Sequence, residues 1–343
     1  MSEDQDLLLT LEGGIALITL NRQKALNALT SAMVVQLSSW LHAFATDPVI
    51  RAVVIMGAGE KAFCAGGDIR QLYDSREMGP VSTRFFRDEY VLNSQIHHFP
   101  KPYIAVLNGI TMGGGVGVSA HGSYRIATER TLWAMPETAI GLFPDVGGSY
   151  ILPRLRGRLG LYLGLTGHRL RAADLCAVGL ATHYMPGTSS QDFIDDLTSG
   201  CEVDQALTCH TVVAESSEFF SQTALIDKLF SAPTVDLILK DLEAEASPWA
   251  SATRDGLLTK SPTSLRLTQE AARRGAQLTF KEAMRMEFRI VSHLMQGRDF
   301  FEGVRALLVD RDNAPLWSPS DLSLVSDAAI DAYFAPLEQE LIL

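Results

Sequence analysis

Short apolar runs recur along the first half of the chain. Leu7–Leu11 and Ile15–Leu20 flank a Glu-Gly-Gly sequence, which is the pattern of a β-hairpin. Residues 52–56 and 103–107 are continuous apolar runs with the length of buried strands. Amphipathic stretches of helical length separate these runs. Strands that alternate with helices predict an α/β layered fold.

The pattern changes near Pro186. Beyond it the chain has few strand-like runs and many amphipathic stretches with helical spacing, such as residues 235–246 and 278–294. We therefore expect two parts, an α/β core over residues 1–190 and a mostly helical C-terminal region over residues 191–343.

The charge balance narrows the classes of partner. The formal net charge is −11 and the isoelectric point is about 5.2, which argues against a nucleic-acid-binding or anionic-membrane-binding surface. Hydrophobic residues make up 47% and charged residues 20% of the chain, so a disordered or fibrous protein is excluded. No apolar run reaches the ~18 residues of a membrane-spanning helix. We expect no nucleic-acid partner and no membrane partner.

The cysteines and the first residues bear on the compartment. Cys64, Cys176, Cys201 and Cys209 have neither CxxC nor zinc-finger spacing, which fits a reducing compartment. The opening sequence MSEDQDLLL is acidic and lacks the basic start of a signal peptide and the Arg- and Ser-rich character of a transit peptide. From these features we expect a cytoplasmic protein.

Two glycine-rich turns are the first candidates for chemistry. Gly66-Gly67 and Gly113–Gly115 each follow a predicted buried strand. Because glycine has no Cβ, such turns let backbone N–H groups approach a ligand closely. Two converging N–H donors would form an oxyanion hole for acyl transfer. The alternative is that these glycines only permit tight turns and close helix packing.

The second turn also fits a different class of site. Residues 115–120 match the pattern GxGxxA, and Glu137 lies 20 residues after Gly117, as in a dinucleotide-binding site. This pattern would indicate an NAD-dependent dehydrogenase. It leaves the first glycine turn without a role, and it begins more than 100 residues into the chain.

Two carboxylates, Glu137 and Asp145, lie close together in an apolar sequence. Pro136 suits the first position of a helix, which would place Glu137 in the first turn, and Asp145 could cap the next helix. Both could therefore serve only to complement helix dipoles. Their apolar neighbours would instead desolvate them and raise their pKa values, which suits general acid–base catalysis.

A third carboxylate, Glu89, lies on an apolar helix face. The helical spacing places it in line with Phe85, Leu92 and Ile96. A glutamate at such a position is costly unless it is paired or faces a cleft. A buried salt bridge and a functional site therefore both remain open.

These motifs together resemble the enoyl-CoA hydratase/isomerase (crotonase) superfamily. Residues 21–29 resemble its N-terminal motif, and the two glycine turns resemble its oxyanion-hole loops. Within it, the chain is most similar to the branch that hydrolyses 3-hydroxyisobutyryl-CoA, and the resemblance covers nearly the whole chain. The stretches that carry it are residues 87–90, 109–117, 135–148, 261–265 and 299–306. The resemblance implies an α/β fold, a crotonase-like spiral of ββα units whose helical C-terminal region covers an acyl-CoA cleft.

The sequence departs from true hydratases at two positions. Hydratases use two glutamates, and one of them follows the first of the three glycines by four residues; here that position is Gly117. Asp145 stands where hydratases commonly carry glycine. The hydrolase branch has this same exchange, so the resemblance implies thioester hydrolysis, as in valine breakdown, and disfavours hydration.

The resemblance also implies a role for each candidate residue. The N–H groups of Gly67 and Gly114 would hold the thioester oxygen. Glu137 would activate a water molecule or attack the carbonyl carbon itself. Asp145 would orient water or substrate beside it, and Glu89 would bind the 3-hydroxyl of the acyl group. The alternatives are an enoyl-CoA hydratase or isomerase that works through Glu137 alone, and an acyl-CoA-binding subunit without catalysis.

The expected partner is an acyl-CoA substrate, so coenzyme A is part of the substrate, and we expect no separate cofactor and no metal. Lys24 is the best candidate for a phosphate contact. By family analogy, Ala65, Asp68 and Ile69 would line the adenine. The superfamily forms several assemblies, so the resemblance allows a homo-oligomer without fixing its subunit number.

Overall fold

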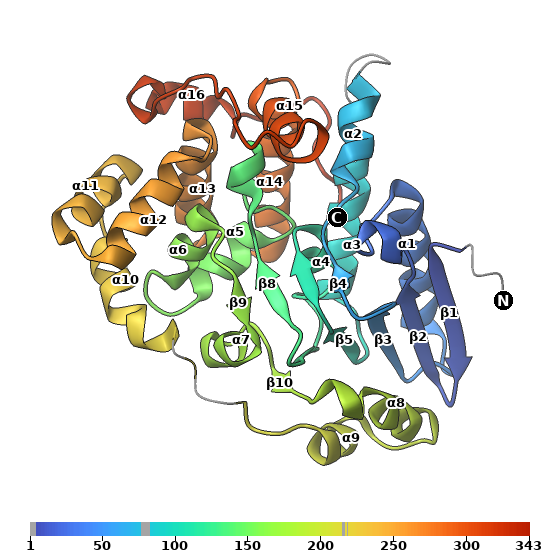
Figure 1. The fold of residues 1–343 in the computed structure, drawn as a ribbon. Helices are drawn as coiled ribbons and strands as arrows, with labels where there is room; N and C mark the ends of the chain where they lie inside the picture. Colours follow the sequence, from blue (N-terminus) through green and yellow to red (C-terminus); the bar gives the residue numbers. More distant parts are fainter. Residues whose placement is uncertain (1–4, 77–82, 215–216, 218) are drawn as a thin grey trace. The chain divides into compact units, whose positions relative to one another are not determined.

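Figure 1 shows a computed structural model of the chain, which describes residues 5–76, 83–214, 217 and 219–343. Residues 1–4, part of the opening sequence on which the predicted compartment rests, lie outside the described residues. The chain forms two compact units. The first unit comprises the segments up to Gly67, Val91–Ala134 and Arg169–Phe220; the second comprises Asp68–Tyr90, Met135–His168 and Ser221–Leu343.

The first unit contains two sheets. Its strands are β1 (Leu7–Glu12), β2 (Ile15–Leu20), β3 (Ala52–Gly57), β4 (Ala62–Cys64), β5 (Tyr103–Leu107), β6 (Ile110–Met112), β7 (Tyr124–Ala127), β8 (Leu132–Ala134), β9 (Leu170–Arg171) and β10 (His183–Tyr184). One sheet has the strand order β1-β2-β3-β5-β7-β10, and the other has the order β4-β6-β8-β9. The predicted hairpin is confirmed, since β1 and β2 pair antiparallel.

From β3 to β8, successive strands alternate between the two sheets. β3, β5 and β7 belong to the six-stranded sheet, and the strand that follows each of them, β4, β6 or β8, belongs to the four-stranded sheet. Neighbours within these two sets pair parallel. Helical segments follow β4, β6 and β8 before the chain continues. This repeat of two strands and a helical segment is the predicted ββα pattern.

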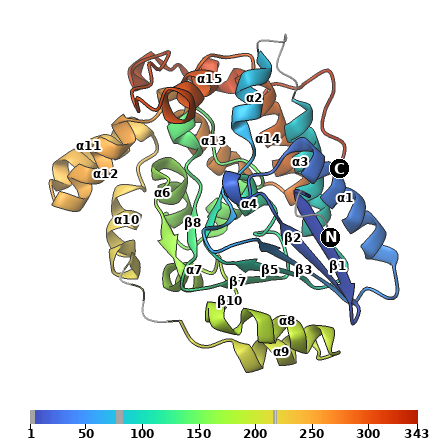
Figure 2. The same cartoon turned by 45° about the vertical axis from the view of Figure 1, so that its right-hand side comes forward.

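Helices cover the six-stranded sheet of the first unit. Its helical segments are η1 (Gln23–Ala25), α1 (Ser31–Thr46), α4 (Gly114–Gly117), α7 (Ala172–Val178), η5 (Gly187–Ser189), α8 (Ser190–Thr198) and α9 (Val203–His210). Figure 2 shows α8 and α9 beside this sheet, and their apolar side chains share one buried core with β3, β5 and β7. The predicted boundary near residue 190 therefore does not separate the two compact units, because α8 and α9, which follow it, pack with the strands.

The described part of the second unit consists of helical segments and loops. They are α2 (Ile69–Ser75), η3 (Glu137–Ile140), α5 (Gly148–Ile151), η4 (Leu152–Arg154), α6 (Leu159–Thr166), η6 (Phe219–Gln222, which straddles the boundary), α10 (Thr223–Leu229), α11 (Val235–Glu245), α12 (Pro248–Leu258), α13 (Pro262–Gly275), α14 (Phe280–Leu294), α15 (Asp299–Val304), the π-helix η7 (Arg305–Val309), η8 (Leu322–Leu324) and α16 (Asp327–Ala332). Helix α3 (Arg84–His97) contributes residues to both units. Within the described ranges, no helix is long and apolar enough to cross a bilayer.

Candidate active site

The two predicted glycine turns lie next to each other in the first unit. They follow β4 and β6, which are neighbouring parallel strands. Gly66 has φ +126°, and Gly113 has φ +50° with ψ −123°, values that favour glycine. A Cβ on Gly66 would lie 3.9 Å from the backbone nitrogen of Gly114. The two turns therefore bring their backbone amides into one small region.

The two amides that the sequence singled out have no backbone acceptor among the described residues: neither Gly67 nor Gly114 donates to a carbonyl there. Gly114 opens α4, and first-turn N–H groups have no acceptor within their own helix. Such a pair of donors can hold a developing negative charge. Helix α4 has only four residues, so the turn lacks the longer helix that opens at the phosphates of a dinucleotide.

Gly115 sets how closely the two turns approach. A Cβ there would lie 2.1 Å from the carbonyl oxygen of Cys64. We expect Gly115→Ala to lower the free energy of unfolding by about 2 kcal/mol or more, because the backbones must separate. Gly256→Ala is the control, since that helical glycine has open space around it and the change should stabilise by about 0.5–1 kcal/mol. Urea titration of both variants measures the difference, and equal stabilities would contradict this packing argument.

The N-terminal motif contacts the first glycine turn. The amide of Ala65 donates to the carbonyl of Leu26 (3.0 Å), and the amide of Leu29 donates to that of Gly66 (2.9 Å). The side chain of Asn27, a residue that sequence analysis did not single out, donates to Ala58 O and Ala62 O. Lys24 is exposed on η1.

Asp68 and Ile69 begin the second unit. The Asp68 side chain accepts a hydrogen bond from the amide of Gln71 (3.3 Å) and so caps α2, of which Ile69 is the first residue. The predicted adenine contacts of Ala65, Asp68 and Ile69 stay predictions.

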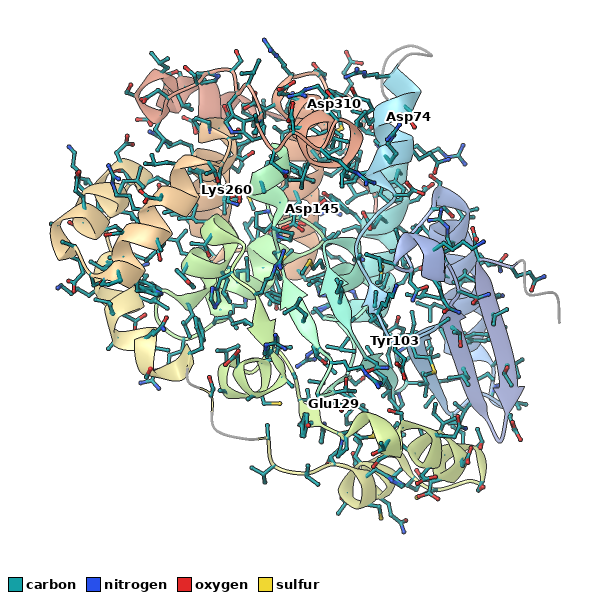
Figure 3. All side chains as sticks on the ribbon, in the orientation of Figure 1. Asp74, Tyr103, Glu129, Asp145, Lys260 and Asp310 are labelled. Atoms are coloured by element: carbon teal, nitrogen blue, oxygen red, sulfur yellow. The ribbon has the colours of Figure 1, made fainter. Side chains whose placement is uncertain are left out.

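The second unit contains a buried acidic cluster. Its members are Glu89, Tyr90, Glu137, Asp145 and Glu287, each no more than 4% exposed. Figure 3 labels Asp145 among the side chains of this unit. The three carboxylates predicted from the sequence are thus all buried in one unit, and Tyr90 and Glu287 join them.

Asp145 is held by a tyrosine. The Tyr90 hydroxyl donates to Asp145 Oδ2 at 2.6 Å. The alternative that Asp145 caps the next helix is wrong, because Gly147 is the N-cap of α5 and the amides at the start of that helix donate to Glu287 rather than to Asp145. Burial raises the pKa of Asp145 to about 6, although the Tyr90 hydrogen bond acts in the opposite direction.

Glu137 lies in the first turn of a helical segment, as predicted, but that segment is the 3₁₀ turn η3, and Pro136 is its N-cap rather than its first residue. Within the described part of the chain neither of its carboxyl oxygens has a hydrogen-bond partner. Burial, followed by the negative charge of Asp145, raises its pKa well above the usual value. An unpartnered buried carboxyl is costly in free energy, so packing and helix-dipole terms alone do not account for this residue.

The segment that carries Glu137 packs backbone to backbone against α15. A Cβ on Gly303 would lie 2.4 Å from the carbonyl carbon of Ile140, and one on Gly141 would lie 2.4 Å from that of Asp299. The glycine within the 299–306 motif is the sequence signal for this contact. The two glycines therefore fix the position of η3 within the second unit.

Glu89 lies on the apolar face predicted for its helix, since Phe85, Leu92 and Ile96 are all buried. The structure gives Glu89 no ion pair among the described residues, and its Oε1 has no hydrogen-bond partner there. Burial and then the charge of Asp145 raise its pKa well above the usual value. A buried salt bridge therefore does not explain Glu89.

Known proteins and solved structures are similar to this chain over nearly its whole length. The chain is 46% identical to the zebrafish (Danio rerio) protein named 3-hydroxyisobutyryl-CoA hydrolase, mitochondrial, over 95% of this chain and 88% of that protein. The human protein of the same name is 42% identical over 97% and 89%. A solved structure titled carnitinyl-CoA dehydratase, from Mycobacterium thermoresistibile, superposes with TM-score 0.95 at 42% identity and covers 99% of both chains. One titled enoyl-CoA hydratase, from Rhodobacter sphaeroides, has TM-score 0.93 at 37% identity and covers 99% of this chain and all of that one.

The relatives contradict the predicted compartment. The zebrafish and human proteins are named as mitochondrial, so the expectation of a cytoplasmic protein is wrong. Its physical basis was too weak, because free cysteines argue only against an oxidising compartment and do not distinguish one reducing compartment from another.

The solved structures confirm the predicted crotonase-like fold, including the helical C-terminal region. A family model described as enoyl-CoA hydratase/isomerase matches residues 15–334. The glycine turns, the buried carboxylates and this match over most of the chain agree, and the chain belongs to the enoyl-CoA hydratase/isomerase family.

Proposed function

We propose that the chain hydrolyses the thioester of (S)-3-hydroxyisobutyryl-CoA, and of the shorter 3-hydroxypropionyl-CoA, to the free acid and coenzyme A, as in valine breakdown. The observation that carries this proposal is the pair Glu137 and Asp145, two buried carboxyls that interact electrostatically and have raised pKa values. The names of the zebrafish and human relatives support the same substrate.

The proposed oxyanion hole consists of the amides of Gly67 and Gly114. Strands β6 and β8 are neighbours and pair parallel. Gly114 lies two residues after the end of β6, and Glu137 lies three residues after the end of β8. The match to the enoyl-CoA hydratase/isomerase family supports assigning both residues to one reaction.

Glu137 would start the reaction by one of two routes. As a general base it takes a proton from water while the water oxygen bonds to the carbonyl carbon. As a nucleophile its carboxylate forms an anhydride, which water then hydrolyses. In both routes the C–S bond breaks and the departing thiolate receives one proton, so water supplies the hydroxyl of the acid and the hydrogen of the thiol. After a single turnover in ¹⁸O-water, label in the Glu137 carboxyl would establish the anhydride route, because it requires water to attack the glutamyl carbonyl and a general base does not exchange its oxygens.

Asp145 and Glu89 would complete the site on the acyl side. Asp145, oriented by Tyr90, would orient the water or the substrate and pass the proton to the thiolate, a role that fits its pKa of about 6. Glu89 would accept a hydrogen bond from the 3-hydroxyl, which would provide a partner for its buried Oε1. Lys24 is proposed for the phosphates, with Ala65, Asp68 and Ile69 near the adenine, and we propose a homo-oligomer whose subunit number stays open.

The second candidate is a hydratase or isomerase that works through Glu137 alone, which the titles of the two solved structures favour. Gly117 counts against it, because hydration by the family's route needs a second glutamate at that position. The test measures thiol release from 3-hydroxyisobutyryl-CoA and the ultraviolet absorbance of crotonyl-CoA. We expect thiol release from the first and no loss of the enoyl absorbance from the second. Loss of the crotonyl-CoA absorbance without thiol release would favour the hydratase.

Tyr90→Phe tests the role assigned to Asp145. The Tyr90 hydroxyl stabilises the ionised form of Asp145, so removing it raises the pKa of Asp145 further above about 6. Asp145 acts from its ionised state, since the proton that it passes to the thiolate is the one removed from water. The acid limb of the pH profile of kcat should therefore move to higher pH, and the loss should be larger at pH 5.5 than at pH 8. Tyr150→Phe, at a half-buried tyrosine outside the cluster, is the control. An equal loss at both pH values would contradict this role.

A further inference from the structure

Glu287 is a buried carboxylate to which the proposed mechanism gives no role. It lies on α14 and is 0% exposed. Both of its oxygens accept hydrogen bonds from the turn that follows Asp145. Oε2 accepts from the amide of Gly147 at 2.8 Å, and Oε1 accepts from the amide and the hydroxyl of Ser149 at 2.9 and 2.5 Å. One carboxyl group thus spans the whole turn.

The turn needs such support. Val146 has φ +48° and Gly147 has φ +88°, so two successive residues adopt the left-handed conformation. For a β-branched valine this conformation is strained and persists only when surrounding contacts impose it. Gly147 also begins α5 without a capping side chain. Glu287 accepts from the amides at the start of that helix and so replaces the missing cap.

The same turn determines the direction of the Asp145 side chain. Asp145 immediately precedes the strained Val146, and its carbonyl accepts from the amide of Gly148 at 2.7 Å. Its carboxyl meets the Tyr90 hydroxyl on one side, while Glu287 holds the backbone on the other. If the turn relaxed, the short aspartate side chain would move with it, and a displacement of 1 Å in a reacting group can reduce a rate about 10²-fold.

We propose that Glu287 is a positioning residue for this reaction: by binding the 147–149 turn it fixes the orientation of the Asp145 carboxyl, without contacting the substrate. The inference rests on the proposed function of Asp145. Burial, and to a smaller extent the charge of Asp145, raises the pKa of Glu287 to about 8, although the hydrogen bonds from Ser149 and Gly147 act in the opposite direction. Ionising Glu287 in the folded chain therefore costs stability. If Glu287 served only to stabilise the start of α5, a capping side chain at the N-cap of that helix would do the same.

Glu287→Gln is the direct test, because it keeps the shape of the side chain but has only one oxygen that can accept a hydrogen bond. The amides of Gly147 and Ser149 then cannot each have an acceptor oxygen of their own. We expect kcat for thiol release to fall about 10–100-fold with KM changed less than about 3-fold. We also expect faster hydrogen exchange at the amides of Gly147 and Ser149. Glu282→Gln is the matched control on the same helix, where the carboxyl likewise accepts from a backbone amide and a hydroxyl, those of Thr279. It should leave kcat and the exchange of the turn unchanged.

The exchange measurement separates the two hypotheses. If the parent releases no thiol, the proposed function fails, yet faster exchange in Glu287→Gln still supports the role of Glu287 in holding the turn. If the parent is active and Glu287→Gln keeps its kcat and its exchange rates, the positioning role is wrong. A lower melting temperature with unchanged kcat per folded molecule also overturns it.

Should Glu287→Gln fail to fold, Ser149→Ala decides the question. It removes one of the three donors and leaves both backbone hydrogen bonds, so kcat should fall about 3-fold or more at unchanged KM. A kcat equal to that of the parent would reject the proposal.

Discussion

Glutamine in place of Glu137 is expected to reduce thiol release from 3-hydroxyisobutyryl-CoA by about 10³-fold or more. The amide can neither take a proton from water nor form an anhydride, so both proposed routes are blocked. KM should change little, because the amide occupies the same volume. A thiol-trapping assay at saturating substrate measures the effect, and release that survives the substitution would reject Glu137 as the acid–base residue or nucleophile.

The same variant should be at least as stable as the parent. Because burial raises the pKa of Glu137, its ionisation costs more free energy in the folded chain than in the unfolded one. This destabilisation is absent below pH 4.5, where the carboxyl is protonated in both states, and grows as the pH rises towards the folded pKa. The melting temperature of Glu137→Gln, relative to the parent, should therefore rise between pH 4 and pH 8.

A control separates chemistry from stability. Glu302→Gln removes a carboxylate of the same unit that accepts hydrogen bonds from Arg305 and from the amide of Leu316. It should lower the melting temperature and leave kcat unchanged. Loss of activity in both variants in proportion to lost folded protein would contradict a chemical role for Glu137.

The pattern of apolar and polar residues was sufficient to predict those strands and turns that pair with elements close to them in the sequence. The hairpin of β1 and β2 and the buried strands β3 and β5 occur where apolar alternation and turn residues predicted them. The grouping into units was not predictable in this way. Helices α8 and α9 follow the last strand yet pack on the sheet, because their apolar faces complement strands more than 60 residues earlier.

The same distinction holds for the site. Composition and spacing identified Glu89, Glu137 and Asp145 as candidates, since each is a carboxylate in an apolar context. They could not identify what orients Asp145, because Tyr90 lies 55 residues away in the sequence. Glu287 is 140 residues from Gly147. For the same reason, the local pattern suggested a helix cap for Asp145, whereas the long-range hydrogen bond from Tyr90 takes its place.

The amide of Gly114 can be tested by a pair of substitutions. Gly114→Ala adds a Cβ and keeps the N–H, whereas Gly114→Pro adds a Cβ and replaces the N–H hydrogen with a ring carbon. Proline is tolerated at the first position of a helix, and Gly114 occupies that position in α4. We expect kcat of the proline variant to lie about 10²–10³-fold below that of the alanine variant, the usual cost of losing one oxyanion donor.

The comparison between the two variants, rather than with the parent, isolates the hydrogen bond. The Cβ is present in both variants, so its steric effect cancels to first order, and we expect the helix after Gly114 to be retained in both. Circular dichroism and the melting temperature check that the pair is equally folded. Equal kcat values in the two variants would mean that the Gly114 amide does not stabilise the oxyanion. In that case thioester cleavage would depend on the carboxylates of the second unit, without the charge stabilisation that the adjacent glycine turns are proposed to supply.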